Sequence, residues 1–144
     1  MRKLIPFSLV GFLLTAGIAW ACTTCAKGPA VIAFFRSNCD ACLKELPELN
    51  KLHALSDGKF KVIGVSVDED VKLYEKFVKE KKASFPTVRY VHWPDKGTLP
   101  PPLNVPMLYY TDKDGKLKGK GLGWFTAEYM EAQVLPLVDK GEQK

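Results

Sequence analysis

The 144-residue chain suits a single domain, and with 47% hydrophobic residues it can form an ordinary core. Its formal net charge is +5, but lysines alternate with acidic residues, as in segments 79–82 and 113–120. Interleaved charges are typical of a solvated surface, so we expect no nucleic-acid partner.

Residues 1–21 predict an export signal. A short basic start, residues 1–3, precedes an apolar run over 7–14 and the small-x-small triplet Ala19-Trp20-Ala21. Two alternatives stay open: an uncleaved membrane anchor, or a lipoprotein signal with Cys22 acylated. The cleaved signal and both alternatives place the domain in the periplasm or another exported location, where disulfides are stable. The anchor and the lipoprotein signal would also tether it to a membrane.

Residues 22–29 predict a short polar linker. The apolar run 30–36 then predicts a buried strand, and leucines at helical spacing predict a helix over 39–56. A second buried strand is expected at 60–67. The acidic residues 68–70 are favourable at the start of the helix that follows.

The second half of the chain predicts shorter elements. We expect a short strand at 88–91, a proline-rich loop at 94–102 and a hairpin turn at 111–115. Strands at 107–110 and 116–121 flank that turn, and a final helix at 126–138 begins near Thr126. With no repeat and no second domain visible, these elements predict one α/β domain over residues 30–140.

Cys39 and Cys42 stand where the first strand gives way to the first helix. Cys39 falls at the helix N-terminus, where free N–H groups and the helix dipole stabilise a thiolate. Cys42 lies one turn further on the same face, close enough to form a disulfide with Cys39. We therefore expect Cys39 to attack a partner disulfide and Cys42 to resolve the mixed disulfide.

Two acidic residues accompany this pair. Asp40 places a carboxylate between the cysteines, which disfavours a thiolate and favours a reducing character. Glu45 returns to the helix face of Cys42 and is a candidate proton donor or acceptor. The alternative interpretations are a solvated capping residue for Asp40 and a surface acid for Glu45.

The string Cys39-Asp40-Ala41-Cys42-Leu43-Lys44-Glu45-Leu46-Pro47 resembles the exported TlpA/ResA-like branch of the thioredoxin-fold proteins. The similarity extends to residues 62–68 and 105–116. The resemblance implies a thioredoxin-like fold, with a central mixed β-sheet flanked by helices, and a thiol–disulfide oxidoreductase that needs no cofactor.

The resemblance also implies residues for partner binding. Pro106 corresponds to the family's cis-proline, which faces the dithiol, and Val105 to the residue that contacts the partner peptide. Expected partners are exported cysteine-containing proteins, such as apocytochrome c, and an upstream thiol–disulfide electron donor. Asn38 and Ala41 replace the family's usual tryptophan and proline, a departure that bears on redox potential and partner choice.

Cys22 and Cys25 form another CxxC. Three alternatives are possible for them: a local Cys22–Cys25 disulfide, a redox relay to Cys39 and Cys42, or lipidation of Cys22. Together with Cys39 and Cys42 they also match the spacing of a four-cysteine site, which makes a zinc- or copper-binding module the alternative function.

Two further readings concern other side chains. His92 could approach the dithiol or a copper ion. A peroxidase of the same superfamily would need threonine where Arg36 stands, three residues before Cys39.

Overall fold

The computed structural model describes residues 22–139, in which strands and helices largely alternate. This range contains β1 (Ala30–Phe35), α1 (Asp40–Ser56), β2 (Lys61–Ser66), α2 (Val71–Lys81), β3 (Thr87–Arg89), the short 3-10 helix η1 (Tyr90–His92), β4 (Met107–Thr111), β5 (Leu117–Leu122) and α3 (Ala127–Asp139). No helix in this part of the chain has the length and apolar character needed to cross a membrane. The predicted export signal, residues 1–21, lies outside the described residues.

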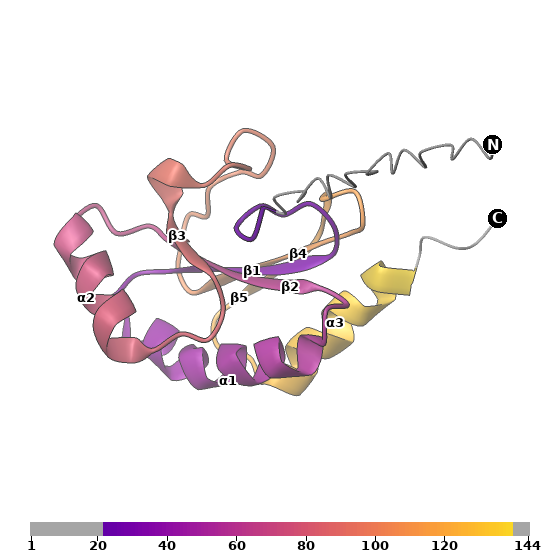
Figure 1. The fold of residues 1–144 in the computed structure, drawn as a ribbon, viewed down its shortest axis with the longest axis horizontal. Helices are drawn as coiled ribbons and strands as arrows, with labels where there is room; N and C mark the ends of the chain where they lie inside the picture. Colours follow the sequence, from indigo (N-terminus) through magenta and orange to yellow (C-terminus); the bar gives the residue numbers. More distant parts are fainter. Residues whose placement is uncertain (1–21, 140–144) are drawn as a thin grey trace, which may run out of the picture.

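The strands form one mixed sheet in the order β3-β2-β1-β4-β5 (Figure 1). β1, β2 and β3 run parallel, whereas β4 is antiparallel to both β1 and β5. The apolar β1 is therefore central and fully buried, as its continuous hydrophobic sequence predicts. The predicted α/β fold with a central mixed sheet is confirmed.

The three α-helices of the described chain, α1, α2 and α3, cover the same face of the sheet (Figure 1). Val31, Ala33 and Phe35 point from β1 toward this face and share one core with apolar side chains of the three helices. Right-handed crossovers that move in one direction across a sheet place successive helices on one side, which accounts for α1 and α2. The core residues contributed by the helices are Cys42, Leu46, Leu49, Leu52, Phe77, Ala127, Met130 and Val134.

The opposite face of the sheet is covered by loops. Ile32 and Phe34 point from β1 toward this face and pack with Trp93, Leu99 and Tyr109. The Trp93 ring meets Phe34 edge-on at 5.3 Å, and the Tyr109 hydroxyl donates to the Pro100 carbonyl at 2.8 Å. The proline-rich loop thus takes the place of a helix layer, so helices flank the sheet on one side only.

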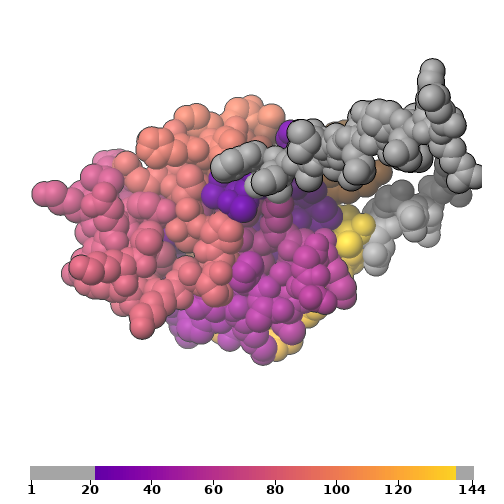
Figure 2. Space-filling view, in the orientation of Figure 1, coloured from indigo at the N-terminus to yellow at the C-terminus, as the bar shows by residue number. Residues whose placement is uncertain are grey.

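The segment expected to be a linker, residues 22–29, packs against this loop-covered face. Cys25 and Ala26 are buried, and Ala26 belongs to the same core as Trp93. The Ala26 N–H donates to the Asp95 carboxylate, which joins the segment to the proline-rich loop. In Figure 2 the first described residues, in indigo, reach the surface beside that loop.

Most predicted element boundaries agree with the structure within one or two residues, and the third strand differs most. The strand expected at 88–91 is shifted to Thr87–Arg89, and Tyr90–His92 form η1 instead. This turn brings Trp93 back over the sheet, where its burial outweighs the strand preference of Tyr90 and Val91. The 3-10 turn therefore anchors the loop layer.

Candidate active site

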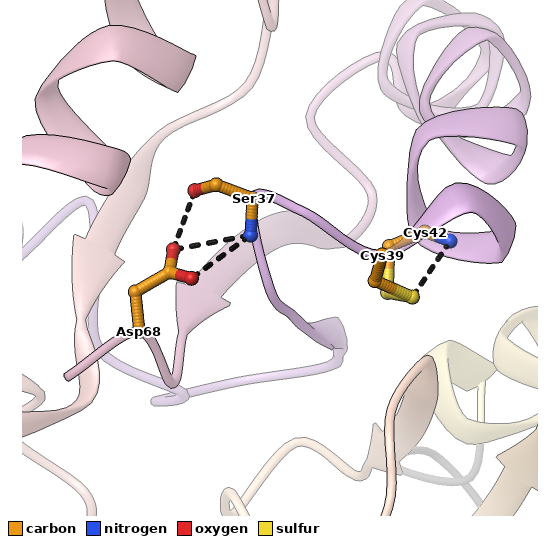
Figure 3. Close-up of a disulfide and its surroundings, with 4 residues drawn as sticks. All are labelled: Ser37, Cys39, Cys42 and Asp68. Carbon is orange, nitrogen blue, oxygen red and sulfur yellow. Dashed lines mark hydrogen bonds between the residues drawn. A yellow bond between two sulfur atoms is a disulfide. The ribbon is translucent and has the colours of Figure 1, made fainter. Parts of the chain in front are cut away.

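The Cys39–Cys42 pair lies at the junction of β1 and α1, at the carboxyl edge of the parallel strands. Cys39 has an extended backbone and is the N-cap of α1, and its sulfur accepts a hydrogen bond from the Cys42 N–H at 3.2 Å. The two cysteines form a disulfide, with Cα atoms 5.2 Å apart (Figure 3). The predicted position of Cys39 at the helix N-terminus is confirmed.

The two sulfurs differ in access to solvent. Cys39 is half-buried, whereas the Cys42 side chain is only 6% exposed and belongs to the core beneath α1. A partner can therefore reach Cys39 first. The helix N-terminus also stabilises negative charge on the Cys39 sulfur after reduction.

Glu45 is buried one helical turn below Cys42. Its side chain is 2% exposed, and burial raises its pKa to about 7, although the Phe125 backbone N–H lowers it in part. One carboxyl oxygen of Glu45 has no hydrogen-bond partner among the described residues. The carboxyl can thus gain or lose a proton near neutral pH, on the helix face that carries Cys42.

Tyr110, on β4, is a neighbour of Glu45 that the sequence interpretation missed. Its hydroxyl is buried without a hydrogen-bond partner in the described chain. Burial raises the pKa of Tyr110 well above its usual value, and the nearby charges of Tyr129 and Glu45 add to this effect. The residue therefore stays neutral and extends the low-polarity surroundings of the Glu45 carboxyl.

The loop before Cys39 is fixed by Asp68, which follows β2. The Asp68 carboxylate accepts hydrogen bonds from the Ser37 N–H at 3.0 Å and from the Ser37 hydroxyl (Figure 3). It also accepts from the Ser66 hydroxyl at 2.7 Å. Of the acidic residues 68–70 expected at the start of the next helix, Asp70 is the N-cap of α2. Asp68 instead holds the active-site loop.

Pro106 lies at the same edge of the sheet as the dithiol. The next residue, Met107, pairs with Phe34 in β1, so Pro106 stands beside the end of β1 from which the Cys39 loop departs. The Val105–Pro106 peptide bond is cis, as the resemblance implied. Val105 is half-buried and packs against the same core as Cys39.

Exposed apolar side chains surround this edge. Leu103, two residues before Val105, is 97% exposed, and a shallow groove runs beside it between the proline-rich loop and the ends of β1 and β2. Trp124 is 41% exposed and donates through its indole N–H to the Lys44 carbonyl in α1 at 3.3 Å. The groove is lined by Arg36, Val67, Pro102, Leu103, Asn104 and Val105.

Two other predicted site residues, Asp40 and His92, are exposed to solvent. Asp40 is exposed in the first turn of α1, where it follows Cys39 directly. His92 is exposed in η1, and nothing in the described chain joins it to the dithiol. Its candidate role as a ligand therefore finds no support in the geometry.

The alternative prediction of a metal site formed by all four cysteines is wrong. Cys22 and Cys25 lie near the start of β1, whereas Cys39 follows its end, so the central strand separates the two pairs. Within residues 22–139, no group of three or more His, Cys, Asp or Glu side chains could hold a metal ion. The spacing of the two CxxC motifs matches a four-cysteine site in sequence, but the residues between them form the extended strand β1, which holds the two pairs apart.

Solved structures with a similar fold include several redox proteins. StoA from Bacillus subtilis has a TM-score of 0.63 at 22% identity, covering 74% of this chain and 81% of that chain. A putative thiol:disulfide interchange protein DsbE from Chlorobium tepidum has a TM-score of 0.64 at 23% identity, covering 78% and 82%. A secreted disulfide oxidoreductase from Mycobacterium tuberculosis has a TM-score of 0.62 at 20% identity, covering 79% and 84%.

These likenesses confirm the thioredoxin-like fold. No curated protein matches the sequence. The family model described as the AhpC/TSA family, however, matches residues 13–120, which is more than half of the chain. The chain therefore belongs to the AhpC/TSA family.

Proposed function

We propose that the protein is a thiol–disulfide oxidoreductase in which Cys39 and Cys42 alternate between dithiol and disulfide. The observation that carries this proposal is the asymmetry of the pair at the N-terminus of α1. Cys39 is reachable and caps the helix, whereas Cys42 is buried behind it. An accessible attacking sulfur and a shielded resolving sulfur are what two-step disulfide exchange requires.

The reaction runs in two displacements. The Cys39 thiolate attacks one sulfur of a partner disulfide, and the other partner sulfur leaves as a thiolate that takes up a proton. Cys42 then loses its proton and attacks the Cys39 sulfur, which releases the second partner thiol. The partner disulfide is reduced by two electrons, and the Cys39–Cys42 dithiol is oxidised to the disulfide.

Glu45 is the proposed acid–base residue of the second displacement. Cys42 is buried and must lose a proton to attack, and the Glu45 carboxyl lies on the same helix face with a pKa near 7. In the ionised form Glu45 favours the neutral Cys42 thiol. As an acceptor it takes the proton that the resolving step releases.

The partner peptide is proposed to bind along Val105 and Pro106. These residues share the sheet edge of the dithiol, and the adjoining groove offers the exposed Leu103 to an apolar side chain next to the partner cysteine. Trp124, beside the first turns of α1, provides a second apolar contact. Apolar flanking residues in the partner would therefore favour binding.

The proposed direction is reduction of exported cysteine-containing proteins, such as apocytochrome c, with electrons from an upstream thiol–disulfide donor. The exposed Asp40 carboxylate between the sulfurs disfavours a thiolate and so favours the disulfide form. One structural relative is described as a secreted disulfide oxidoreductase. The predicted signal in residues 1–21 agrees with an exported or membrane-tethered location.

A glutathione redox series tests this proposal. Cys39 and Cys42 lie between Arg36 and Lys44, so trypsin releases both on one peptide whose alkylation reports the oxidation state. We expect a reversible two-electron transition with a potential below that of glutathione, lost in Cys39→Ser. A Cys39–Cys42 pair that stays reduced throughout the series, or that excess dithiothreitol leaves oxidised, would refute the activity, and a potential above that of glutathione would refute the direction.

A further inference from the structure

Cys22 and Cys25 repeat, outside the active site, the asymmetry of Cys39 and Cys42. Cys22 is exposed, whereas the Cys25 side chain is only 5% exposed. The Cys25 thiol donates to the Cys22 carbonyl at 3.3 Å, which folds the two residues into one tight turn. The pair therefore has one accessible sulfur and one shielded sulfur held next to it.

The backbone of this turn is fixed to the domain. The Lys61 ammonium, at the start of β2, donates to the Cys22 carbonyl at 2.7 Å and to the Cys25 carbonyl at 3.3 Å. On the next residue, the Ala26 N–H donates to the Asp95 carboxylate. Anchors on both sides of the pair make it a defined site on the surface.

The local charges also favour thiol chemistry at Cys22. The adjacent Cys25 side chain lowers the pKa of Cys22, whereas burial raises the pKa of Cys25. The positive charge of Lys61 lowers the pKa of Cys25 and so offsets part of the increase that burial causes. The exposed sulfur is thus the better nucleophile of the two at neutral pH.

This turn is remote from the Cys39–Cys42 pair. Lys61 pairs with Ala30 at the start of β1, and the active site follows Phe35 at the other end of that strand. A six-residue strand spans about 17 Å, far beyond the reach of a disulfide bond. Direct exchange between the two pairs within one molecule is therefore not available in this fold.

We propose that Cys22 and Cys25 form a second dithiol–disulfide site, which exchanges with cysteine-containing peptides or proteins independently of Cys39 and Cys42. Cys22 attacks one sulfur of the partner disulfide, and the other partner sulfur leaves and is protonated. Cys25 then loses its proton, attacks the Cys22 sulfur and releases the second partner thiol. Two electrons pass to the partner, and a Cys22–Cys25 disulfide forms.

Differential alkylation of the full chain tests this proposal directly. Trypsin cleaves after Lys27 and after Arg36, so each cysteine pair falls on its own peptide. Along a glutathione series, we expect the peptide ending at Lys27 to change by two labels together, with its own midpoint. The peptide containing Cys39 and Cys42 reports the first site in the same sample, so failure of one proposal is distinguishable from failure of the other.

A trapping variant tests the roles of the two sulfurs. Cys25→Ser should accumulate a mixed disulfide at Cys22 with a peptide disulfide, whereas Cys22→Ser should trap at least tenfold less at Cys25. Equal trapping in the two variants would overturn the assigned roles. Cys22 and Cys25 labels that never change together, or a Cys22 that carries a permanent blocking group, would overturn the site itself.

Discussion

The Asp68 carboxylate and the Ser37 backbone N–H are joined by hydrogen bonds of 3.0 and 3.2 Å, one to each carboxylate oxygen. This contact ties the loop that follows β1 to the end of β2. It leaves only Asn38 between the fixed Ser37 and the N-cap Cys39. The position of the Cys39 sulfur therefore depends on Asp68, which lies 31 positions after Ser37 in the sequence.

Asp68→Asn is expected to destabilise the oxidised protein by about 1–3 kcal/mol. The amide would turn its NH2 group toward one of the donors on Ser37 or Ser66, leaving a buried donor unpaired. Urea denaturation followed by circular dichroism measures the change. Asp70→Asn is the matched control, since asparagine caps α2 as well as aspartate does, and equal stability of the two variants would contradict this role of Asp68.

Glu45→Gln is expected to remove a pH dependence of stability. In the wild type, the raised pKa means that the unfolded chain loses this proton first as pH rises from about 4.5. Stability therefore falls between about pH 4.5 and 7, by on the order of 3 kcal/mol, and stays low above that range. Denaturation midpoints at pH 5 and pH 8 should differ less in Glu45→Gln than in the wild type.

The exposed Glu75, on α2, supplies the control for this experiment. Glu75→Gln should keep the wild-type difference between pH 5 and pH 8. The same two variants separate the proposed catalytic role of Glu45 from its structural effect. Glu45→Gln should slow the resolving step most strongly above pH 7, where the wild-type carboxylate can accept the Cys42 proton.

Trp124→Ala is expected to raise the KM for a disulfide peptide with apolar flanking residues by roughly fivefold, with little change in kcat. The indole lies against the Lys44 backbone and offers its exposed ring at the dithiol edge. Val78→Ala, at an exposed position late in α2, should leave the KM unchanged. An equal KM for Trp124→Ala and the wild type would remove Trp124 from the docking surface.

Gly115→Ala is expected to destabilise the protein by roughly 1–3 kcal/mol and to speed alkylation of Cys25. Gly115 has φ +76°, and a Cβ there would lie 2.7 Å from the Ala26 carbonyl oxygen. The substitution therefore pushes the segment before β1 away from the β4–β5 turn. Gly97→Ala, where the added methyl would meet nothing within 4 Å, should match the wild type in stability and in Cys25 labelling.

The sequence predicts those parts of the fold that depend on local pattern. The apolar run of β1 and the leucine spacing of α1 place the strand and helix that carry Cys39 and Cys42. The spacing of Glu45 after Cys42 places both on one helix face, and the family resemblance over residues 105–116 points to Pro106. Each of these features is encoded within a few neighbouring residues.

The features that were missed depend on contacts between distant residues. In sequence, Asp68 belongs to an acidic run that suits a helix start, and only the folded chain brings it within reach of Ser37. The packing of Cys25 and Ala26 depends likewise on Lys61 and Asp95. Polar residues flanking that turn resemble those of a free linker, so composition alone could not reveal the anchors.

The one-sided arrangement of helices divides the molecule into two layers of unequal resistance to local unfolding. The helix layer shields Cys42 with interlocked side chains, whereas Cys25 lies under loop segments joined by isolated hydrogen bonds such as that from Ala26 to Asp95. Loop layers of this kind open at lower free energy than a packed helix layer. Mild heating or low urea should therefore expose Cys25 to a thiol reagent well before it unfolds α1.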